Sequence, residues 1–488
     1  MKFDNSFARL PERFFARVLP ARAPDPVMIK VNLKLGEELG LETSWLTGSE
    51  GVAILSGRSV APGSDPIATA YAGHQFGGFS PQLGDGRAIL LGEVIGRDGK
   101  RRDIQLKGGG RTPYSRNGDG RAALGPVLRE YIVSEAMAAL GVPTTRSLAA
   151  VATGERIYRE GVLPGAVLTR VASSHIRVGT FQFFAARGDV EGLHILADHV
   201  IARHYPEAAL SPRPYRALLD KIIEGQASLI AHWMQIGFIH GVMNTDNVSI
   251  ACETIDYGPC AFMDAYHPET VFSSIDRNGR YAYGNQPRIG LWNLTRFAET
   301  LIPLLHADEE QATADAQEAL SAYGPRLLEI QLEGFHRKLG LEVSGEEDAD
   351  FVSAMFASLA ANQVDFTLFF RRLGDAIEPG TGDDGLRALF ADPTAADEFL
   401  VGWRARLERE QGPPSERRRA MHAVNPTYIP RNHRVEEVIR AAVDEGDFAP
   451  FERLMDVLAH PFEDKKGSEY YLMPPRHEER VLATFCGT

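Results

Sequence analysis

The sequence predicts an α+β protein made of two lobes and a helix-rich C-terminal extension. Strand-like segments and one clear helix dominate the first part of the chain, a long helix leads into a polar loop in the next, and the pattern is predominantly helical from Leu291 onward. With 488 residues, 44% of them hydrophobic, the chain can bury more than one core. We therefore expect a mostly β N-terminal lobe at residues 1–163, a helical C-terminal lobe at 164–300, and a helical extension at 301–488 that ends in a cysteine-containing tail.

The N-terminal lobe is expected to contain a β-hairpin followed by a helix. Residues 87–94 and 103–107 have the apolar character of strands, and Asp98 and Gly99 between them suit a tight turn. Residues 127–140 follow a proline and show a helical pattern, which agrees with the tolerance of proline in a first helical turn.

Helices should dominate the remainder of the chain. The turn-like residues 161–165 are expected near the junction of the two lobes. Residues 214–237 carry leucine and isoleucine at near-helical spacing and should form the long helix that leads into the polar loop. Further helices are expected at residues 308–323, 325–339, 349–373, 395–411 and 435–445.

The loop after this long helix resembles the catalytic loop of protein kinases. Kinases use His-Arg-Asp-x-x-x-x-Asn or, when they act on small molecules, often His-Gly-Asp-x-x-x-x-Asn, and His240 and Asn247 have this separation. Asn247 and Asp256 offer the oxygen ligands that Mg²⁺ prefers. Val242 occupies the position of the kinase base, which disfavours ordinary phosphoryl transfer, and Asp246 is a further carboxylate in the loop. The sequence thus predicts a bilobal protein-kinase-like fold with an altered catalytic loop.

The upstream half contains groups that could bind phosphate. Lys107 ends its strand where a kinase places its phosphate-binding lysine, and Glu130 lies near the start of the next helix, so the two could form the ion pair that aims the lysine. Gly84, Gly86 and Arg87 precede the first strand of the hairpin. Glycines let the backbone approach phosphate oxygens, and the arginine adds positive charge.

Several motifs together resemble those of the selenoprotein O (YdiU) family of kinase-like proteins. They are residues 71–77 (YAGHQFG), 82–88 (QLGDGRA), 105–108 (QLKG), 112–116 (TPYSR), 241–247 (GVMNTDN) and 285–287 (NQP). The match runs through most of the chain, and the ordered set is specific although a Gly-x-Gly pair alone is not. The resemblance implies a protein adenylyltransferase that moves AMP from ATP to serine, threonine or tyrosine hydroxyls of proteins, with Mg²⁺ or Mn²⁺, and binds the nucleotide flipped relative to kinases.

The resemblance also implies roles for individual residues. The residues that would line the nucleotide are Gly84, Gly86, Arg87, Lys107, Asp119, Gly120 and Asp256, and those that would hold its phosphates are Arg170 and Arg177. Asp246 matches the family's proton acceptor, and Asn247 and Asp256 match its metal ligands. With the nucleotide flipped, a base in place of Val242 would have nothing to deprotonate.

The charges of these residues suit the implied reaction. Attack at the α-phosphorus expels pyrophosphate, so the transition state requires fixed cations near the leaving group. Lys107, Arg170 and Arg177 would supply them, and each arginine can bind phosphate oxygens through two donors. An aspartate near the acceptor hydroxyl would take its proton, a contribution of roughly 10²–10⁴-fold.

Each assignment has a structural alternative. Lys107 could be a solvated residue at a strand end, and the arginines could be ordinary salt-bridge partners. Asp246 and Asn247 could simply form a turn, as could Asp119 with the glycine that follows it. His240 is expected to brace the loop through hydrogen bonds and to stay outside the chemistry.

Three other functions stay open at this stage. A kinase could use Asp246 as its base despite Val242. A non-catalytic scaffold could bind nucleotide without turning it over, although the presence of the lysine, glutamate, asparagine and aspartate disfavours this. UMP transfer from UTP with Mn²⁺ is a variant of the favoured reaction, because contacts to pyrophosphate do not distinguish the base.

Composition excludes other classes of protein. A formal net charge of -13 and a pI near 5.6 argue against binding to nucleic acid, which requires clustered lysine and arginine. No run approaches the about 20 apolar residues of a membrane span, and the N-terminus has neither a signal peptide nor a transit peptide. We expect a cytoplasmic bacterial protein, whose protein substrates and oligomeric state the sequence does not indicate.

Three cysteines are too few for a disulfide framework. Cys252 and Cys260 lie in apolar stretches on either side of Asp256 and are expected to be small buried residues. Cys486 lies third from the end, where members of the resembled family carry selenocysteine or cysteine, and the resemblance implies redox sensitivity and, in some members, pairing with an internal cysteine. Residues 271–274, where such a partner would be sought, contain no cysteine, so Cys252 or Cys260 would have to replace it.

Overall fold

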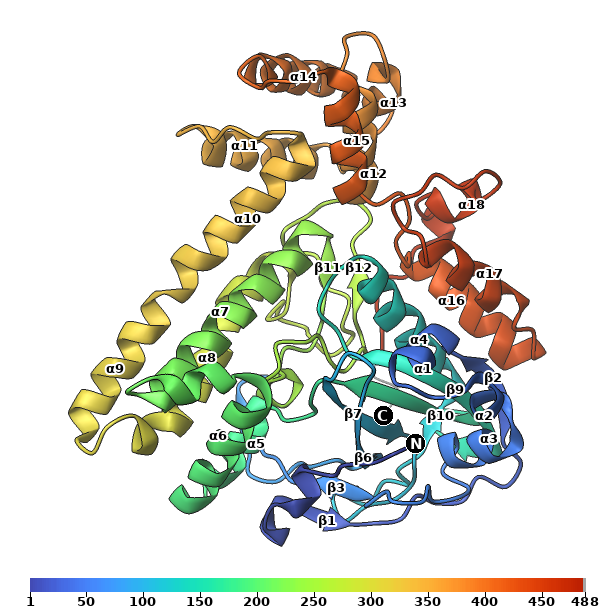
Figure 1. Cartoon of the computed structure of the whole chain (residues 1–488). Helices are drawn as coiled ribbons and strands as arrows, with labels where there is room; N and C mark the ends of the chain where they lie inside the picture. Colours follow the sequence, from blue (N-terminus) through green and yellow to red (C-terminus); the bar gives the residue numbers. More distant parts are fainter. Residues whose placement is uncertain (486–488) are drawn as a thin grey trace.

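An antiparallel β-sheet organises the N-terminal part of the protein (Figure 1). Its strands are β1 (Phe15–Arg17), β2 (Val27–Val31), β3 (Ile67–Thr69), β6 (Ala88–Ile95), β7 (Arg101–Lys107), β8 (Ala122–Ala123), β9 (Arg146–Tyr158) and β10 (Val162–Ala172). The computed structural model describes residues 1–485, and within them this sheet has eight strands in the order β1-β3-β6-β7-β10-β9-β2, with β8 paired to β10.

The hairpin expected at residues 87–94 and 103–107 is confirmed as β6 and β7. The two strands pair in antiparallel fashion, and Lys107 lies opposite Ala88. Gly99 has the positive φ of 75° that a tight turn requires. Lys107 is thereby fixed at the end of an inner strand of the sheet.

The turn expected at residues 161–165 is wrong, because residues 162–165 belong to β10, which pairs with β9. Pro164 suggested a turn, but it lies at a register shift in the strand pairing, where a missing N–H is tolerated. The sheet extends to Ala172, and the division between lobes at residue 163 stays a prediction.

Helices cover both faces of the sheet. Helices α1 (Leu33–Glu38), α2 (Thr43–Thr47) and α3 (Ser49–Leu55) lie on one face, and α4 (Leu124–Ala139) lies on the other. Because successive strand residues point to opposite faces, Val167 packs with α1 to α3, whereas Leu168 packs with α4. Helix α4 confirms the helix expected at residues 127–140.

The middle of the chain is helical, as expected. It contains α5 (Val178–Ala185), α6 (Val190–His204), α7 (Pro214–Gln235), α8 (Gln286–Leu305), α9 (Glu309–Ser321) and α10 (Tyr323–Leu339). Two small sheets accompany these helices, β4 (Gly73–Gln75) with β5 (Gly78–Ser80) and β11 (Phe238–Ile239) with β12 (Ala261–Phe262). Fully buried aromatic side chains join the helices, such as Phe181 of α5 and Phe297 of α8, whose rings meet edge to face at 5.1 Å.

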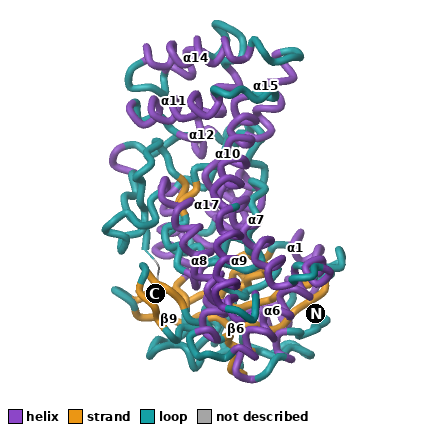
Figure 2. Tube along the Cα trace, turned by 90° about the vertical axis from the view of Figure 1, so that its left-hand side faces the viewer, coloured by secondary structure: helices purple, strands orange, loops and turns teal. Residues whose placement is uncertain are grey.

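The C-terminal extension is helical, but its helices differ in part from those expected. They are α11 (Asp348–Ala361), α12 (Phe366–Asp375), α13 (Asp383–Arg387), α14 (Pro393–Leu407), α15 (Pro414–Val424), α16 (Asn432–Arg440), α17 (Ala449–Leu458) and α18 (Glu469–Leu472). Helices α11, α12, α14 and α15 form a group at one end of the molecule in both views (Figures 1 and 2). The single helix expected at residues 349–373 is wrong, because Gln363 takes a left-handed φ of 52° and Asp365 caps a new helix by accepting a hydrogen bond from Leu368 N at 2.8 Å.

The last helices cover the outer side of α4. The rings of Tyr131 in α4 and Phe451 in α17 meet at 5.7 Å. Arg129 donates to Asn432 Oδ1 at 3.0 Å and to the carbonyl oxygen of Cys260 at 3.2 Å. Helix α4 is thus held between the sheet and the C-terminal helices. This fixes the position of Glu130, which follows Arg129 in the helix.

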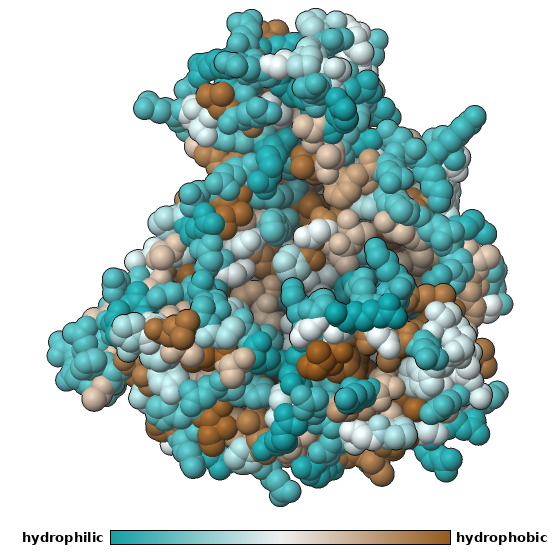
Figure 3. Space-filling model, in the orientation of Figure 1, coloured by the Kyte–Doolittle hydropathy of each residue, from teal (hydrophilic) through white to brown (hydrophobic). Residues whose placement is uncertain are grey.

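Hydrophilic residues cover much of the face shown in Figure 3. Within residues 1–485, no helix has the length and apolar character needed to cross a membrane. This agrees with the absence of a run of about 20 apolar residues in the sequence.

Candidate functional site

A cavity of about 550 Å³ brings the sequence-predicted residues together. Those that line it are Gly84, Gly86, Arg87, Lys107, Asp119, Gly120, Arg170, Arg177, Asp246, Asn247 and Asp256. They come from the loops before β6 and before β8, from strands β7 and β10, from the N-cap of α5 and from the loops that follow α7. Glu130 is not part of the lining and lies behind Lys107, to which it is bonded.

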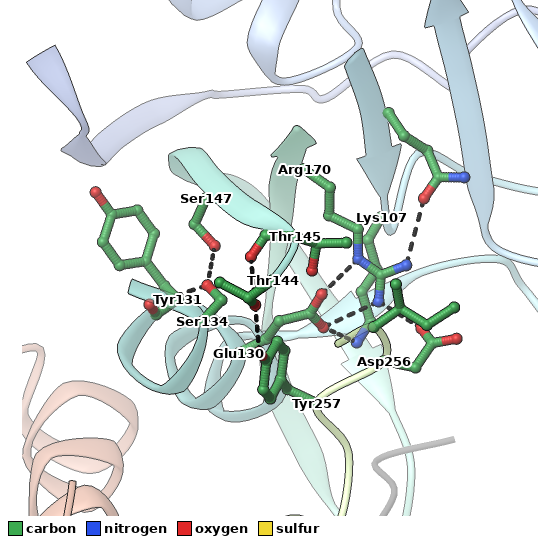
Figure 4. Close-up of polar contacts among 12 residues, drawn as sticks. Lys107, Glu130, Tyr131, Ser134, Thr144, Thr145, Ser147, Arg170, Asp256 and Tyr257 are labelled. Atoms are coloured by element: carbon green, nitrogen blue, oxygen red, sulfur yellow. Dashed lines mark hydrogen bonds and ion pairs between the residues drawn. The ribbon is translucent and has the colours of Figure 1, made fainter. Parts of the chain in front are cut away.

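Glu130 joins two cations of the cavity wall (Figure 4). Lys107 and Arg170 point to the face of the sheet that packs on α4, because Lys107 lies opposite Leu168 and Arg170 follows Leu168 by two residues. Lys107 Nζ bonds to Glu130 Oε2, and Arg170 binds the same carboxylate through Nε and through Nη2, the latter at 3.0 Å. The expected ion pair is therefore present and includes Arg170 as a second cation.

The pKa values of this cluster follow from its burial. Lys107 is 4% exposed, so it is not a solvated residue at a strand end. Burial lowers the pKa of Lys107, although the Glu130 carboxylate opposes that effect. Burial also disfavours the ionised form of Glu130, but the charges of Arg170 and Lys107 outweigh it and lower the pKa of Glu130.

Asp256 bridges the two arginines of the cavity. Its Oδ1 accepts from Arg170 Nη2 at 2.7 Å, and its Oδ2 accepts from Arg177 Nη1. Burial opposes ionisation of this carboxyl, but the two guanidinium groups hold its pKa well below the usual range. Arg177 also lies over the ring of Tyr71, 4.9 Å from its centre, and donates to the carbonyl oxygen of Asp246 at 2.5 Å.

Asp246 and Asn247 lie in a 3₁₀ turn, Thr245–Asn247, which agrees with the alternative interpretation of these residues as a turn, and both also line the cavity. Asp246 Oδ2 accepts from Gln75 Nε2 at 3.1 Å, while Oδ1 is buried and has no hydrogen-bond partner among residues 1–485. Burial raises the pKa of Asp246 to about 6, although Arg177 opposes the rise. The carboxylate can therefore accept a further hydrogen bond or a proton.

The donor set fits a divalent cation that is shared with a substrate. No cluster of three or more His, Cys, Asp or Glu side chains able to hold a metal occurs in the described part of the chain. Asn247 and Asp256 line the same cavity and offer one amide and one carboxylate oxygen. Asn247 Nδ2 donates to the carbonyl oxygen of Val242 at 3.0 Å, which leaves its amide oxygen for a ligand. Two such ligands suit Mg²⁺, which usually completes its shell with water and phosphate oxygens.

The glycine-containing loop at residues 84–87 is held rigidly at the cavity. Asp85 Oδ2 accepts from Thr69 N at 3.0 Å and from Thr69 Oγ1 at 2.6 Å. Gly84 has a φ of 87°, and a Cβ there would lie 2.4 Å from Cγ of Tyr114, so a side chain at this position would require Tyr114 to move.

Asp119 and Gly120 lie in the loop between β7 and β8 at the cavity edge, just after a turn at residues 113–117, so the alternative of a turn at residues 119 and 120 themselves is wrong. Asp119 accepts from Arg159 Nη1 at 2.8 Å and from Nη2 at 2.9 Å, and these hydrogen bonds lower its pKa. The backbone of Gly120 passes so close to Gly110 that a Cβ would lie 2.1 Å from the Gly110 carbonyl oxygen. The bond from Gly110 N to the Gly120 carbonyl oxygen, 3.0 Å long, fixes the two loops together.

His240 braces the loop, as expected. It is buried, its Nε2 lies 2.8 Å from the carbonyl oxygen of Ile255, and it is not among the residues lining the cavity. Its backbone N–H donates to Gln286 Oε1 at 3.0 Å. This bracing ties the loop of Asp246 to the loop of Asp256.

The cysteines are placed as expected only in part. Cys260 is fully buried, while Cys252 is partly buried and burial raises its pKa to about 12. Cys486 lies outside the described residues. Thr484, two residues before it, runs beside residues 272–274, with its N–H donating to the Phe272 carbonyl oxygen at 2.7 Å and its carbonyl accepting from Ser274 N at 3.0 Å.

Some cavity residues received no role from the sequence. Gln75, Tyr71 and Asn244 line the cavity and contact the candidate residues or their loop directly. Gln75 and Tyr71 stand in the motif at residues 71–77, but no local pattern shows that this motif meets a loop 171 residues further along. Only similarity to a known family could have drawn attention to them.

Comparison with known proteins gives consistent matches. A family model described as "Protein adenylyltransferase SelO" matches residues 1–459. A protein nucleotidyltransferase YdiU of Methylorubrum extorquens is 61% identical over 492 residues, which cover 100% of this chain and 99% of that protein. A protein of the same name from Rhodopseudomonas palustris is 63% identical over 486 residues, which cover 100% of this chain and 99% of that protein. Another, from Rhizobium etli, is 59% identical over 488 residues, which cover 100% of this chain and 97% of that protein.

Proposed function

The chain belongs to the SelO family of protein adenylyltransferases, and on this premise we propose that it transfers AMP from ATP to serine, threonine or tyrosine hydroxyls of proteins and releases pyrophosphate. Its class as a nucleotidyltransferase follows from the family. The acceptor hydroxyls, the metal, the orientation of the nucleotide and the role of each residue are the proposal.

We further propose that the sheet and the helical part correspond to the two lobes of a protein-kinase-like fold. Lys107 on β7 and Glu130 on α4 have the elements and the bond that the kinase pair requires. The loop of Asn247 and the loop of Asp256 line the same cavity as Lys107, and Asp256 is joined to Glu130 through Arg170. The extension after residue 300 is an addition to this arrangement.

The observation that carries the proposal is the concentration of three buried cations at one cavity. Lys107, Arg170 and Arg177 are at most 4% exposed, and Glu130 and Asp256 are the carboxylates bonded to them. Burying charged groups carries a desolvation cost, and clusters of charged groups in a cavity are frequent at sites that act on charged ligands. A triphosphate meets this requirement, and its pyrophosphate part would take the arginine donors that Asp256 holds in the structure.

Asp246 is the proposed base. Its carboxylate accepts the proton of the acceptor hydroxyl, whose oxygen then bonds to the α-phosphorus while the bond to pyrophosphate breaks. Asp246 Oδ1, which is buried and has no hydrogen-bond partner among residues 1–485, supports this role. When bound by Asn247 and Asp256, Mg²⁺ or Mn²⁺ would neutralise charge on the phosphates.

The flipped orientation of the nucleotide is supported by two features of the cavity. Val242 stands where a kinase has its base, so a γ-phosphate bound as in kinases would have no base opposite it. The arginines lie beside Asp256, where they would hold a leaving pyrophosphate, and Asp246 remains for the acceptor.

Intact-mass analysis tests the proposal. The full chain is incubated with ATP and Mg²⁺, with and without a protein acceptor, and the products are weighed. A gain of one AMP on the chain or the acceptor is expected, and UTP with Mn²⁺ in a parallel reaction shows whether UMP is also transferred. A gain of one phosphate would support a kinase instead, and no gain under any condition would support a non-catalytic nucleotide-binding protein.

A further inference from the structure

The β4–β5 hairpin, residues 73–80, lies directly against the loop that carries Asp246. His74 N donates to Thr245 Oγ1 at 2.7 Å, and Phe76 N donates to Asn244 Oδ1 at 3.0 Å. Between these two backbone bonds, Gln75 reaches Asp246 with its side chain. Three successive residues of the hairpin therefore contact three residues of the loop.

Gln75 is the side chain that holds the Asp246 carboxylate. Its Nε2 lies 3.1 Å from Asp246 Oδ2, and no other side-chain donor to this carboxylate is found within residues 1–485. Arg177 does not take this place, because it donates to the backbone carbonyl oxygen of Asp246. The orientation of the carboxylate plane thus depends on a neutral amide rather than on a cation.

Gly73 makes room for the same carboxylate. A Cβ at this position would lie 2.8 Å from Asp246 Oδ1 and 3.0 Å from Asp246 Cβ. The backbone of Gly73 consequently lies close to Asp246 Oδ1, while the side chain of Gln75 donates to Asp246 Oδ2. Both contacts restrict how the carboxylate can rotate.

We infer that Gln75 is a positioning residue, which orients the Asp246 carboxylate for the acceptor hydroxyl and leaves nucleotide binding unaffected. The inference rests on the proposed function of Asp246. A neutral donor suits this task because it fixes the carboxylate without the strong charge stabilisation that an arginine would supply, which would make the carboxylate a weaker base.

The hairpin has supports that do not involve Gln75. Thr245 Oγ1 donates to Gln182 Oε1 at 2.7 Å, and Gln182 Nε2 lies 2.9 Å from His74 Nδ1, so these three side chains and the backbone form a closed set of hydrogen bonds. Loss of the Gln75 donor should therefore leave the hairpin in place. A change in catalysis can then be assigned to the carboxylate.

The test uses the full chain and α-labelled ATP with a protein acceptor. Gln75→Met keeps the length of the side chain and removes the donor, and it is compared in the wild-type background and in an Asp246→Asn background. Gln311→Met is the matched control, because Gln311 Nε2 donates to Asp315 Oδ1 at 3.3 Å on α9, away from the cavity. Rates of label transfer, KM for ATP and ATP affinity by calorimetry are measured for each.

Gln75→Met should lower kcat by roughly 10–100-fold, the range for loss of a hydrogen bond to a charged group, with KM and affinity for ATP unchanged. In the Asp246→Asn background the same substitution should cause no further loss, because the two residues act as a unit. Gln311→Met should keep the wild-type kcat.

An equal fold-loss from Gln75→Met in both backgrounds, or a changed KM for ATP as the main effect, would overturn the positioning role while leaving AMP transfer established. If Asp246→Asn itself kept the wild-type kcat, the role of Asp246 as the base would fail, and the inference about Gln75 with it. If the wild-type chain transferred γ-label instead of α-label, the proposed function would fail, whatever the effect of Gln75→Met.

Discussion

Removal of the Glu130 carboxylate should destabilise the fold, and Glu130→Gln tests this with little change in side-chain shape. In the wild type, the carboxylate bonds to Lys107 Nζ and to Arg170 Nε and Nη2. In the variant, both cations lose that charge, and Asp256 becomes the remaining carboxylate bonded to Arg170. The glutamine would also turn an N–H group or a neutral oxygen toward them.

The magnitude follows from burial. The side chains of Lys107, Glu130 and Arg170 are 6%, 1% and 5% exposed, so water screens their charges little. Removing one partner from a buried ion pair typically destabilises by about 3–5 kcal/mol, far more than the 0–1 kcal/mol of a surface pair. We expect Glu130→Gln to lower the free energy of unfolding by an amount in the buried range.

Urea denaturation of the full chain measures this effect, and a double-mutant cycle identifies its origin. In Glu130→Gln, both Lys107 and Arg170 lose the carboxylate to which they bond. Adding Lys107→Met removes one of these two cations, so the double variant should be more stable than the sum of the single losses predicts, by roughly 1–3 kcal/mol. Strictly additive losses, or a loss below about 1 kcal/mol for Glu130→Gln, would refute the account of a buried, mutually dependent cluster.

Further predictions concern the loops and a buried acid. Asp256→Ala should abolish AMP transfer, because it removes a proposed metal ligand. Asp246→Ala should keep its affinity for ATP, measured by calorimetry, and slow the chemical step by roughly 10²–10⁴-fold. If both variants lost ATP affinity equally, this division of roles would be contradicted. Burial raises the pKa of Glu253 to about 7, although its bonds to Ser173 oppose the rise. The contribution of the Glu253 proton to the free energy of unfolding is therefore complete below about pH 4.5 and is lost as pH rises through 7. Relative to wild type, the free energy of unfolding of Glu253→Gln should thus increase by up to about 3 kcal/mol from pH 5 to pH 8. Urea denaturation at both pH values measures this, and a difference that stays constant would contradict it.

Local signals in the sequence were sufficient for the elements that carry Lys107 and Glu130. An Asp-Gly turn between two apolar segments and a proline at a helix start predict the β6–β7 hairpin and α4, because these signals act within a few residues. Where a local signal had two interpretations, the prediction was wrong. Pro164 suggested a turn but lies within β10, and the capping side chain of Asp365, which divides α11 from α12, was overlooked inside an apolar pattern.

The candidate site shows the same limit at longer range. The motifs supplied its residue types, and the structure places them around one cavity. The sequence did not show that Arg170 and Arg177 both bind Asp256, or that Gln75 binds Asp246, because these pairs are 79 to 171 residues apart and depend on how strands, loops and hairpin pack together. Pairing of this kind follows from the tertiary structure alone.

The fate of the phosphates of ATP tests the central claim most directly. If Lys107, Arg170 and Arg177 hold the terminal phosphates as a leaving group, label should remain on the protein acceptor from α-labelled ATP and should leave as pyrophosphate from γ-labelled ATP. An analogue with a non-hydrolysable β,γ bond should still support transfer, and an α,β-methylene analogue should not. Retention of the γ-label on the acceptor would contradict AMP transfer and restore a kinase.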